Sequence, residues 1–159
     1  MATTNMTHIR LDDGSYQLET SCWVPHSIET VFDFFSDAFN LQALTPDYLN
    51  FQILTPAPIE MAVGQIIEYK IRLRGFPMRW RTEITKWDPP HGFQDSQIKG
   101  PYSLWLHDHM FREENGGTRC SDRVTYRVPG GMIVQKLLVG RDVERIFAYR
   151  DTQMKHIFP

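Results

Sequence analysis

Two histidines and one aspartate carry the clearest chemical signal in this sequence. His107 and His109 stand two residues apart in a strand-like run over residues 103–111, and Asp122 lies in a second such run over residues 118–128. Imidazole and carboxylate groups orient ligands, hold metal ions and transfer protons. Which of these roles is open to the three side chains depends on whether the chain brings them to one place.

The segment between the two runs decides whether these groups meet. It reads Asn115-Gly116-Gly117, and a two-residue Asn-Gly turn there predicts a β-hairpin. Side chains alternate faces along a strand, so eight residues then share one face. They pair as His109 with Asp122, His107 with Val124, Trp105 with Tyr126, and Phe111 with Cys120. A three-residue turn would shift the parity and separate the groups.

The other face of the same hairpin is polar. It carries Asp108, Arg112, Arg119, Arg123 and Arg127, side chains that suit solvent. The first face is therefore apolar and aromatic, with two imidazoles and one carboxylate set into it. A surface of this composition is more typical of a ligand cavity than of a dry core.

Four interpretations of the His107, His109 and Asp122 group stay open. Asp122 can accept a proton from His109 and fix its tautomer, as in a buried, satisfied polar pair. The imidazoles and carboxylate can orient a polar group of a bound small molecule. Two histidines and a carboxylate can also ligate a metal, although the third ligand must converge from the neighbouring strand, and we assign no metal. General acid–base catalysis, with His109 and Asp122 as candidates, is the fourth.

Several further side chains are candidates for lining a binding site. Large amphipathic aromatics often line pockets and turn a polar atom toward the ligand, so Tyr69, Trp80, Trp105 and Tyr126 are wall or core residues. On the predicted C-terminal helix, Arg150 falls near the apolar stripe between Ile146 and Met154. It serves either as a salt bridge at the edge of that stripe or as an anchor for a ligand carboxylate. Tyr149 carries a comparable ambiguity.

The remaining periodicity predicts an α+β fold. A helix begins at the cap residue Ser27 and buries Ile28, Val31, Phe32 and Phe35. A short second helix covers residues 40–44, and a long helix covers residues 132–158, weakened locally by Gly140. The first fourteen residues are expected to be loosely ordered. Strands are predicted over residues 16–24, 51–54, 65–74, 79–87, 93–99, 103–111 and 118–128.

The two strands over residues 65–74 and 79–87 form a second predicted hairpin. An even-length turn over residues 75–78 puts Tyr69 on the face of Trp80, with arginines and glutamates on the opposite, outer face. Because acidic residues are interleaved with the arginines, this outer face is interpreted as solvated.

Composition narrows the class of protein. The chain has 159 residues, a net charge of −2 and a sequence pI of about 6.3, which suits one domain and gives no indication of nucleic acid as a partner. Cys22 and Cys120 lack metal or redox spacing and fit free thiols in a reducing cytoplasm. No signal pattern and no apolar run of about 18 residues occurs, so we expect a cytoplasmic protein without membrane insertion.

With these residues in this order, the chain resembles the START-like or SRPBCC superfamily, and within it an uncharacterised bacterial cyclase/dehydrase-like subfamily of ligand-binding proteins. The resemblance covers about residues 16–158. It is carried by Trp23-Val-Pro25 before Val31-Phe-Asp-Phe-Phe35, Leu41-Gln-Ala-Leu-Thr-Pro46, Ile53-Leu-Thr-Pro56, Pro77-Met-Arg-Trp-Arg-Thr-Glu-Ile84, Gly100-Pro-Tyr102, Trp105-x-His107-x-His109-x-Phe111, and Gly117-Thr118 with Asp122-Arg-Val-Thr-Tyr126.

The resemblance implies a helix-grip fold. In that fold a curved antiparallel sheet, here of about seven strands, surrounds a long C-terminal helix, and two short helices follow the first strand. A cavity lies between sheet and helix, and the apolar face derived above would be its wall. Residues 56–63 and 100–102 and the second short helix are candidates for the entrance.

Fold and composition together favour a binding protein. We expect it to bury an apolar or aromatic small molecule, lipid- or polyketide-like, without a cofactor, using Tyr69, Trp80, Trp105, His107, His109, Tyr126, Tyr149 and Arg150. The alternative is a cyclase, dehydratase or isomerase that uses a His109–Asp122 acid–base pair. A protein-interaction role through the sheet is the third possibility. The ligand and the oligomeric state do not follow from the sequence.

Overall fold

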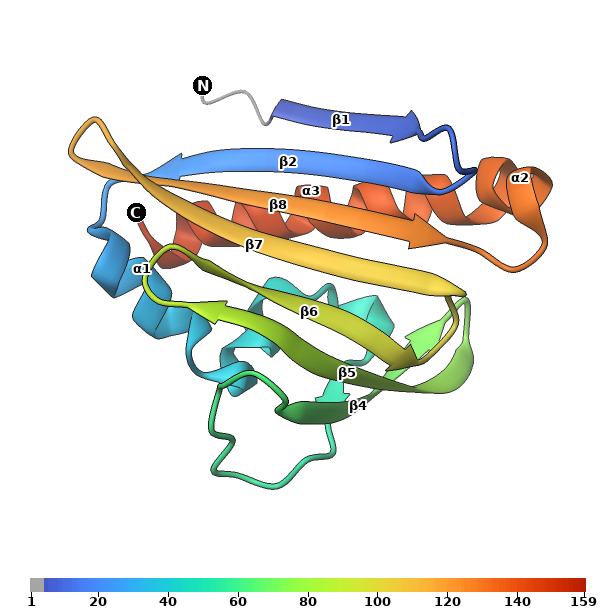
Figure 1. Ribbon diagram of the computed structural model, residues 1–159, viewed down its shortest axis with the longest axis horizontal. Helices are drawn as coiled ribbons and strands as arrows, with labels where there is room; N and C mark the ends of the chain where they lie inside the picture. Colours follow the sequence, from blue (N-terminus) through green and yellow to red (C-terminus); the bar gives the residue numbers. More distant parts are fainter. Residues whose placement is uncertain (1–4) are drawn as a thin grey trace.

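The protein, analysed as a computed structural model that describes residues 5–159, is built on one antiparallel sheet (Figure 1). The eight strands lie in the order β1-β2-β8-β7-β6-β5-β4-β3. Their bounds are β1 Asn5–Arg10, β2 Tyr16–Val24, β3 Gln52–Ile53, β4 Ile66–Leu73, β5 Phe76–Asp88, β6 Gly92–Lys99, β7 Leu104–Glu114 and β8 Gly117–Arg127.

Helical segments cover one face of this sheet. Between β2 and β3 the chain forms α1 (Ile28–Phe35) and the 3-10 turns η1 (Ala38–Leu44) and η2 (Asp47–Leu49). After β8 it forms α2 (Gly131–Val134), the π-helical turn η3 (Gln135–Val139) and α3 (Gly140–Ile157), which runs along β2 and β8 (Figure 1). This arrangement is the α+β helix-grip fold that the sequence predicted.

Strand β1 was not predicted, because residues 1–14 were expected to be loosely ordered. Residues 5–10 pair in antiparallel register with β2, from Asn5 opposite Ser21 to Arg10 opposite Tyr16. Within residues 5–159 the sheet therefore has eight strands instead of about seven. This edge strand buries little side-chain area, so its sequence shows no strong alternation. The expectation for residues 1–4 lies outside the described part of the chain.

The β7–β8 hairpin has the register predicted from its turn. Asn115 and Gly116 form a two-residue turn with φ of 50° and 75°, the left-handed geometry of a type I′ turn. His109 lies opposite Asp122, and Trp105 lies opposite Tyr126. Since the parity holds, the two imidazoles and the Asp122 carboxylate share the inner face.

The β4–β5 hairpin is tighter than predicted but keeps the same parity. Its two-residue turn consists of Arg74 and Gly75, so residues 76–78 belong to β5 instead of the turn. Tyr69 lies opposite Trp80, as expected from an even-length connection. The rings stack with centroids 5.7 Å apart, which places both on the inner face.

The predicted helices are present, with local changes of type. Ser27 caps α1 by accepting from the backbone N–H of Thr30, and the four predicted apolar residues are buried. The second short helix is the 3-10 turn η1, which begins two residues earlier than expected. The long C-terminal helix contains the π turn η3 directly before Gly140, where the sequence predicted weakness.

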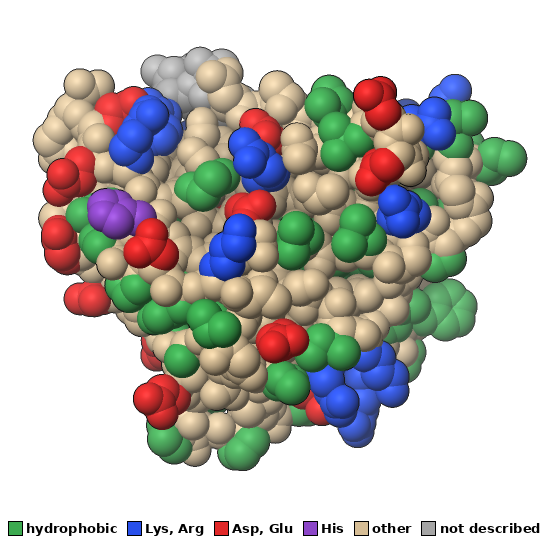
Figure 2. Space-filling model, in the orientation of Figure 1, with side chains coloured by type: hydrophobic (Ala, Val, Ile, Leu, Met, Phe, Trp, Pro, Cys, Tyr) green, Lys and Arg blue, Asp and Glu red, His purple; other side chains and the backbone are tan. Residues whose placement is uncertain are grey.

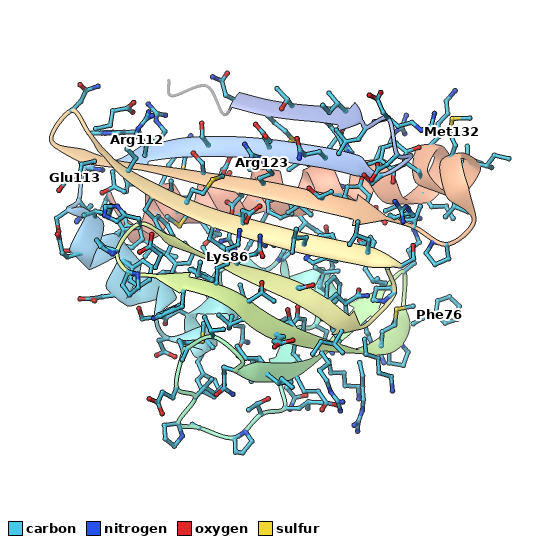
Figure 3. The ribbon with its side chains drawn as sticks, in the orientation of Figure 1. Phe76, Lys86, Arg112, Glu113, Arg123 and Met132 are labelled. Atoms are coloured by element: carbon cyan, nitrogen blue, oxygen red, sulfur yellow. The ribbon has the colours of Figure 1, made fainter. Side chains whose placement is uncertain are left out.

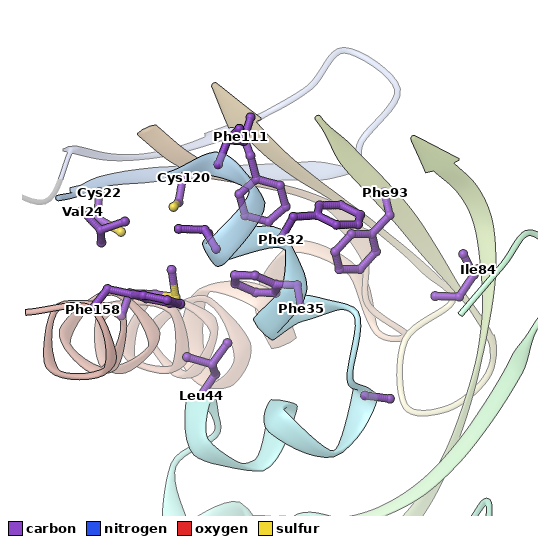
Figure 4. Close-up of a cluster of buried hydrophobic side chains, with 14 of the residues drawn as sticks. Cys22, Val24, Phe32, Phe35, Leu44, Ile84, Phe93, Phe111, Cys120 and Phe158 are labelled. Atoms are coloured by element: carbon purple, nitrogen blue, oxygen red, sulfur yellow. The ribbon is translucent and has the colours of Figure 1, made fainter. Parts of the chain in front are cut away.

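The apolar core divides into two clusters on the inner face. Figure 4 shows the first, in which Phe32, Phe35, Phe93 and Phe111 pack edge-to-face or tilted between α1 and the sheet. The second cluster lies around Trp80, Trp105, Tyr126, Val143 and Phe147. A polar group of side chains is inserted between these clusters.

Substitution of Gly117 by Ala tests the close contact that starts β8. An added Cβ would lie 2.3 Å from the Val24 carbonyl oxygen and 2.6 Å from the Trp23 ring. We expect a loss of about 2 kcal/mol in the free energy of unfolding, measured by urea denaturation. Gly100→Ala, whose Cβ would lie closest to the Gln97 side chain instead of backbone, is the control and is expected to lose less. Equal losses would contradict the prediction.

Candidate ligand cavity and its buried polar cluster

A cavity of about 160 Å³ lies between the inner face of the sheet and the helical segments. Most of its lining is apolar and comes from α1, η1, β4, β5, β6, β7 and α3. The segments expected near an entrance contribute Met61, Tyr102 and the η1 residues Leu41 and Leu44. One part of the polar lining forms a hydrogen-bonded group that includes His107, His109, Asp95 and Arg150, together with Thr82. A second part, Asp37, Asn40 and Thr45, lies in and beside η1.

His107 is held by Asp122. The Nε2–H of His107 donates to Asp122 Oδ1 at 2.7 Å, and the guanidinium Nε of Arg150 donates to Asp122 Oδ2 at 3.1 Å. All three side chains are buried. Burial alone would raise the pKa of Asp122, but Arg150 and the bond from His107 hold that pKa well below its usual range. Asp122 is thus a carboxylate, and His107 turns its N–H toward it.

His109 is held from the opposite side, by Asp95. Its Nε2–H donates to Asp95 Oδ2 at 2.6 Å, and Arg150 Nη2 donates to its Nδ1 at 3.2 Å. Burial, reinforced by the nearby His107, lowers the pKa of His109 to about 4. Burial opposes ionisation of Asp95, but the hydrogen bond from His109 keeps the pKa of Asp95 below its ordinary value. Near neutral pH His109 is therefore an uncharged imidazole between a carboxylate and a guanidinium.

The expected hydrogen bond between His109 and Asp122 is therefore not formed. The pairs that form are His107 with Asp122 and His109 with Asp95. His109 Nδ1 lies 3.6 Å from Asp122 Oδ1, whereas His107 Nε2 approaches that oxygen to 2.7 Å. The imidazole rings stack with centroids 3.6 Å apart, and Phe93 stacks on the other side of His109 at 4.0 Å. Each imidazole thus bonds a diagonal partner across the sheet, although the backbone register puts His109 opposite Asp122.

Asp95 is the site residue that the sequence analysis missed. It lies on β6 directly opposite His107, on the side of β7 away from β8. Its position two residues after Phe93 was the available signal, because both then belong to one face. The loop over residues 100–103 has no turn signature that fixes the register of β6 on β7, so the partner could not be assigned from sequence.

Six of the eight predicted binding residues line the cavity: Tyr69, Trp80, Trp105, His107, His109 and Arg150. Tyr126 does not, because its hydroxyl lies 2.6 Å from both His8 Nε2 and Gln135 Nε2, outside the cavity lining. Tyr149 is half-buried and also lies outside the lining. One residue along a helix turns a side chain by about 100°, so Tyr149 and Arg150 face different directions.

Arg150 lies where both of its predicted roles, a salt bridge and a contact with the ligand, are possible. It is a buried salt-bridge partner of Asp122, and it lines the cavity. Its guanidinium also lies over the Phe35 ring, 5.3 Å from the centroid. Since two of its nitrogens are bound to Asp122 and His109, its first effect is to fix the polar cluster.

Asp95, His107 and His109 are also a candidate metal trio, with ligand atoms within 4.8 Å of one another. Two histidines and a carboxylate suit several transition metals. However, His109 and Asp95 are bonded to each other, and the Arg150 guanidinium donates to His109 Nδ1. A cation would have to displace these bonds next to a fixed positive charge, so the geometry favours an internal hydrogen-bond network.

The fold and this cavity together define the helix-grip, SRPBCC-type class. Within that class, the family described as "Polyketide cyclase / dehydrase and lipid transport" matches residues 24–148, and the chain belongs to this family. No curated protein matches the chain. No helix among residues 5–159 is long and apolar enough to cross a membrane.

Solved structures support the fold at low sequence identity. Protein Ms6760 from Mycobacterium smegmatis is 15% identical, with 96% of this chain and 97% of that chain covered and a TM-score of 0.69. Protein CV1439 from Chromobacterium violaceum is 12% identical, with 89% and 96% covered and a TM-score of 0.70. The ginseng major latex-like protein 151 from Panax ginseng is 8% identical, with 91% and 98% covered and a TM-score of 0.65.

Removing the guanidinium of Arg150 is expected to destabilise the protein strongly. Arg150→Met leaves the buried Asp122 carboxylate without its cation, which costs about 3–5 kcal/mol of unfolding free energy. Arg123→Met is the matched control, because Arg123 pairs with Glu19 on the exposed face and its loss costs at most about 1 kcal/mol. Urea denaturation of both variants measures the difference. Similar losses would show that Arg150 does not hold the cluster.

Acidification is expected to destabilise the fold through His109. Its pKa is about 4 in the folded protein and about 6.5 in the unfolded chain, so the unfolded chain binds the proton more readily. The stability contributed by neutral His109 is present above pH 6.5 and is lost as the pH falls toward 4, by roughly 3 kcal/mol. Unfolding free energies of the wild type and His109→Gln across this range measure the effect.

The comparison with His109→Gln is needed because Asp151 acts in the opposite direction. Burial raises the pKa of Asp151 to about 6, so this carboxyl favours the folded state as the pH falls through the same range. The difference between the two proteins separates the His109 contribution from that of Asp151. Parallel pH curves for wild type and variant would contradict the assignment.

Proposed function

We propose that this protein binds a small, largely apolar ring compound in its internal cavity. The observation that carries the proposal is an apolar cavity that meets one buried, hydrogen-bonded group of ionisable side chains. Apolar walls favour ligand burial by about 25 cal/mol per Å², before the entropy cost of binding is subtracted. The polar group then selects among ligands of similar size.

The cavity volume sets the size of the ligand. An apolar cavity of about 150 Å³ in another protein accepts benzene, and sites for larger ligands span roughly 300–1,000 Å³. At about 160 Å³, this cavity suits one ring or two fused rings in the conformation described. A long-chain lipid would require η1 and the neighbouring loops to move outward.

Two polar atoms near the cavity favour a ligand hydroxyl or carbonyl. The indole N–H of Trp80 is buried and has no hydrogen-bond partner among the described residues, and Trp80 lines the cavity. His107 donates through Nε2, and its Nδ1 lies 3.9 Å from Asp95 Oδ2, beyond hydrogen-bond distance. A ligand hydroxyl group can accept a hydrogen bond from the Trp80 N–H and donate one to His107 Nδ1.

The alternative is an enzyme of the cyclase, dehydratase or isomerase type. One observation favours it: Asp122, kept ionised by Arg150, fixes the tautomer of His107 and leaves Nδ1 as a proton acceptor. That arrangement suits a general base for removing a proton next to a carbonyl group. The base would be His107, supported by Asp122, in place of the His109 expected from sequence.

Calorimetric titration with 2-naphthol and naphthalene tests the binding proposal. Trp80→Phe replaces the indole by a smaller aromatic ring without the N–H, so it is expected to weaken 2-naphthol about tenfold and to change naphthalene much less. Trp87→Phe is the control, because Trp87 packs on Phe32 and is not part of the cavity lining. If neither compound binds the wild type, the small-ring proposal is wrong.

His107→Gln separates the binder from the enzyme. A binding protein should show weaker or altered ligand preference and no turnover in either form. An enzyme acting on a polyketide-like β-carbonyl compound should lose turnover by about a hundredfold or more, with a much smaller change in affinity. Product analysis by mass spectrometry, alongside calorimetry, provides both measurements.

A further inference from the structure

The helical segment that follows β8 has its apolar and polar sides reversed. Along α2 and η3 the buried side chain is Gln135, which is only 5% exposed. Ile133 and Leu137 are 70% exposed, and Met132 and Leu138 are also exposed. Packing against the protein would bury the opposite set of residues, so this segment presents its apolar side chains outward.

Gln135 is held inward by a specific contact instead of by apolar packing. Its Nε2 donates to the Tyr126 hydroxyl at 2.6 Å, and that hydroxyl in turn lies 2.6 Å from His8 Nε2. The π turn begins at Gln135. This bond fixes the rotation of the segment and therefore keeps the apolar side chains in solvent.

A second exposed apolar side chain lies at the same end of the molecule. Phe76 starts β5 at the tip of the β4–β5 hairpin and is 70% exposed. The hairpin is attached to the helical segment, because Arg74 donates to the Leu138 carbonyl at 2.7 Å and pairs with Asp142 at 3.0 Å. Figure 3 shows Met132 and Phe76 projecting from this end.

Basic side chains surround these apolar tips. Lys136 and Arg141 are exposed on the helical segment and have no ion-pair partner among residues 5–159. Of the acidic neighbours, Asp142 is ion-paired with Arg74, and Glu144 is hydrogen-bonded to His8. Figure 2 shows further basic side chains gathered over β4 and β5, where Glu68 pairs with Arg79 and Arg81. The whole chain has a net charge of −2, so this positive charge is local.

We propose that this end of the protein docks on the surface of a lipid bilayer that contains anionic lipids. Apolar side chains on two projecting tips can enter the headgroup region separately, whereas a flat protein partner would need a continuous surface. The adjoining Lys136 and Arg141 match the negative charge of such a surface. Docking of this kind is peripheral and needs no membrane-spanning helix.

Docking at this end would also place the cavity near the bilayer. Leu73, which lines the cavity, is the residue directly before the β4–β5 turn. Ile146 lines it from α3, two turns beyond Leu138. This end of the cavity would therefore lie close to the docked membrane surface.

Sedimentation with phosphatidylcholine–phosphatidylglycerol vesicles tests the proposal, with phosphatidylcholine vesicles as the reference lipid. The wild type is expected to sediment with the anionic vesicles and to be released by high salt. Ile133→Glu is expected to weaken binding about tenfold or more, and Lys136→Glu with Arg141→Glu to remove the preference for anionic lipid. Val63→Glu is the matched control, because Val63 is 65% exposed in the loop between β3 and β4.

Three outcomes would overturn the proposal. The wild type fails to sediment with anionic vesicles, or Val63→Glu weakens binding as much as Ile133→Glu. The third is a wild-type dimer in light scattering that Ile133→Glu converts to a monomer, which would assign the surface to a second copy of the chain. Circular dichroism verifies that each variant is folded. We expect all of them to fold, because the substituted positions are exposed. None of these readouts depends on the cavity ligand.

Discussion

The ion pair between Arg150 and Asp122 is the interaction on which the polar interior depends. A guanidinium and a carboxylate buried together rarely add net stability relative to an apolar pair, because both lose their hydration. Their effect here is orientation: Asp122 fixes His107, and Arg150 fixes His109 while that ring donates to Asp95. One pair from α3 and β8 thus determines the hydrogen-bonding of two histidines on β7.

The two histidines differ in what they leave available, although they are two residues apart on one strand. Both nitrogens of His109 are engaged, by Asp95 and by Arg150. His107 uses Nε2, and its Nδ1 stays beyond hydrogen-bond distance of Asp95. His107 is therefore the residue able to meet a ligand with a free lone pair, and His109 is its stacked support. In the proposed binding site, the imidazole that can still bond a ligand is the one with a nitrogen that has no partner in the network.

Turn chemistry explains how far the sequence could predict this site. Asn115-Gly116 permits a left-handed two-residue turn, and this alone fixed the β7–β8 register and the inner face. No comparable signal joins β6 to β7, so Asp95 was missed. The register shows which side chains share a face, but it does not show which of them form hydrogen bonds with each other. The sequence therefore could not predict that His107, and not His109, bonds Asp122. Tyr126 was misplaced because its partners, His8 and Gln135, come from segments without a strong pattern.

The C-terminal helix connects the interior to the surface through its irregular start. From Val143 onward its buried residues are apolar except for two. Arg150 belongs to the polar cluster, and Asp151 accepts a hydrogen bond from Thr20 on β2. Before Gly140 the buried residue is polar and the exposed residues are apolar, and the change occurs at the π turn. Gln135 donates to Tyr126 and Arg150 donates to Asp122, so the helical segment is bonded to β8 at its start and again within α3. If the start of the helical segment moved relative to β8, the bond between Gln135 and Tyr126 would have to break. The bond between Arg150 and Asp122 would still hold the cavity wall in place.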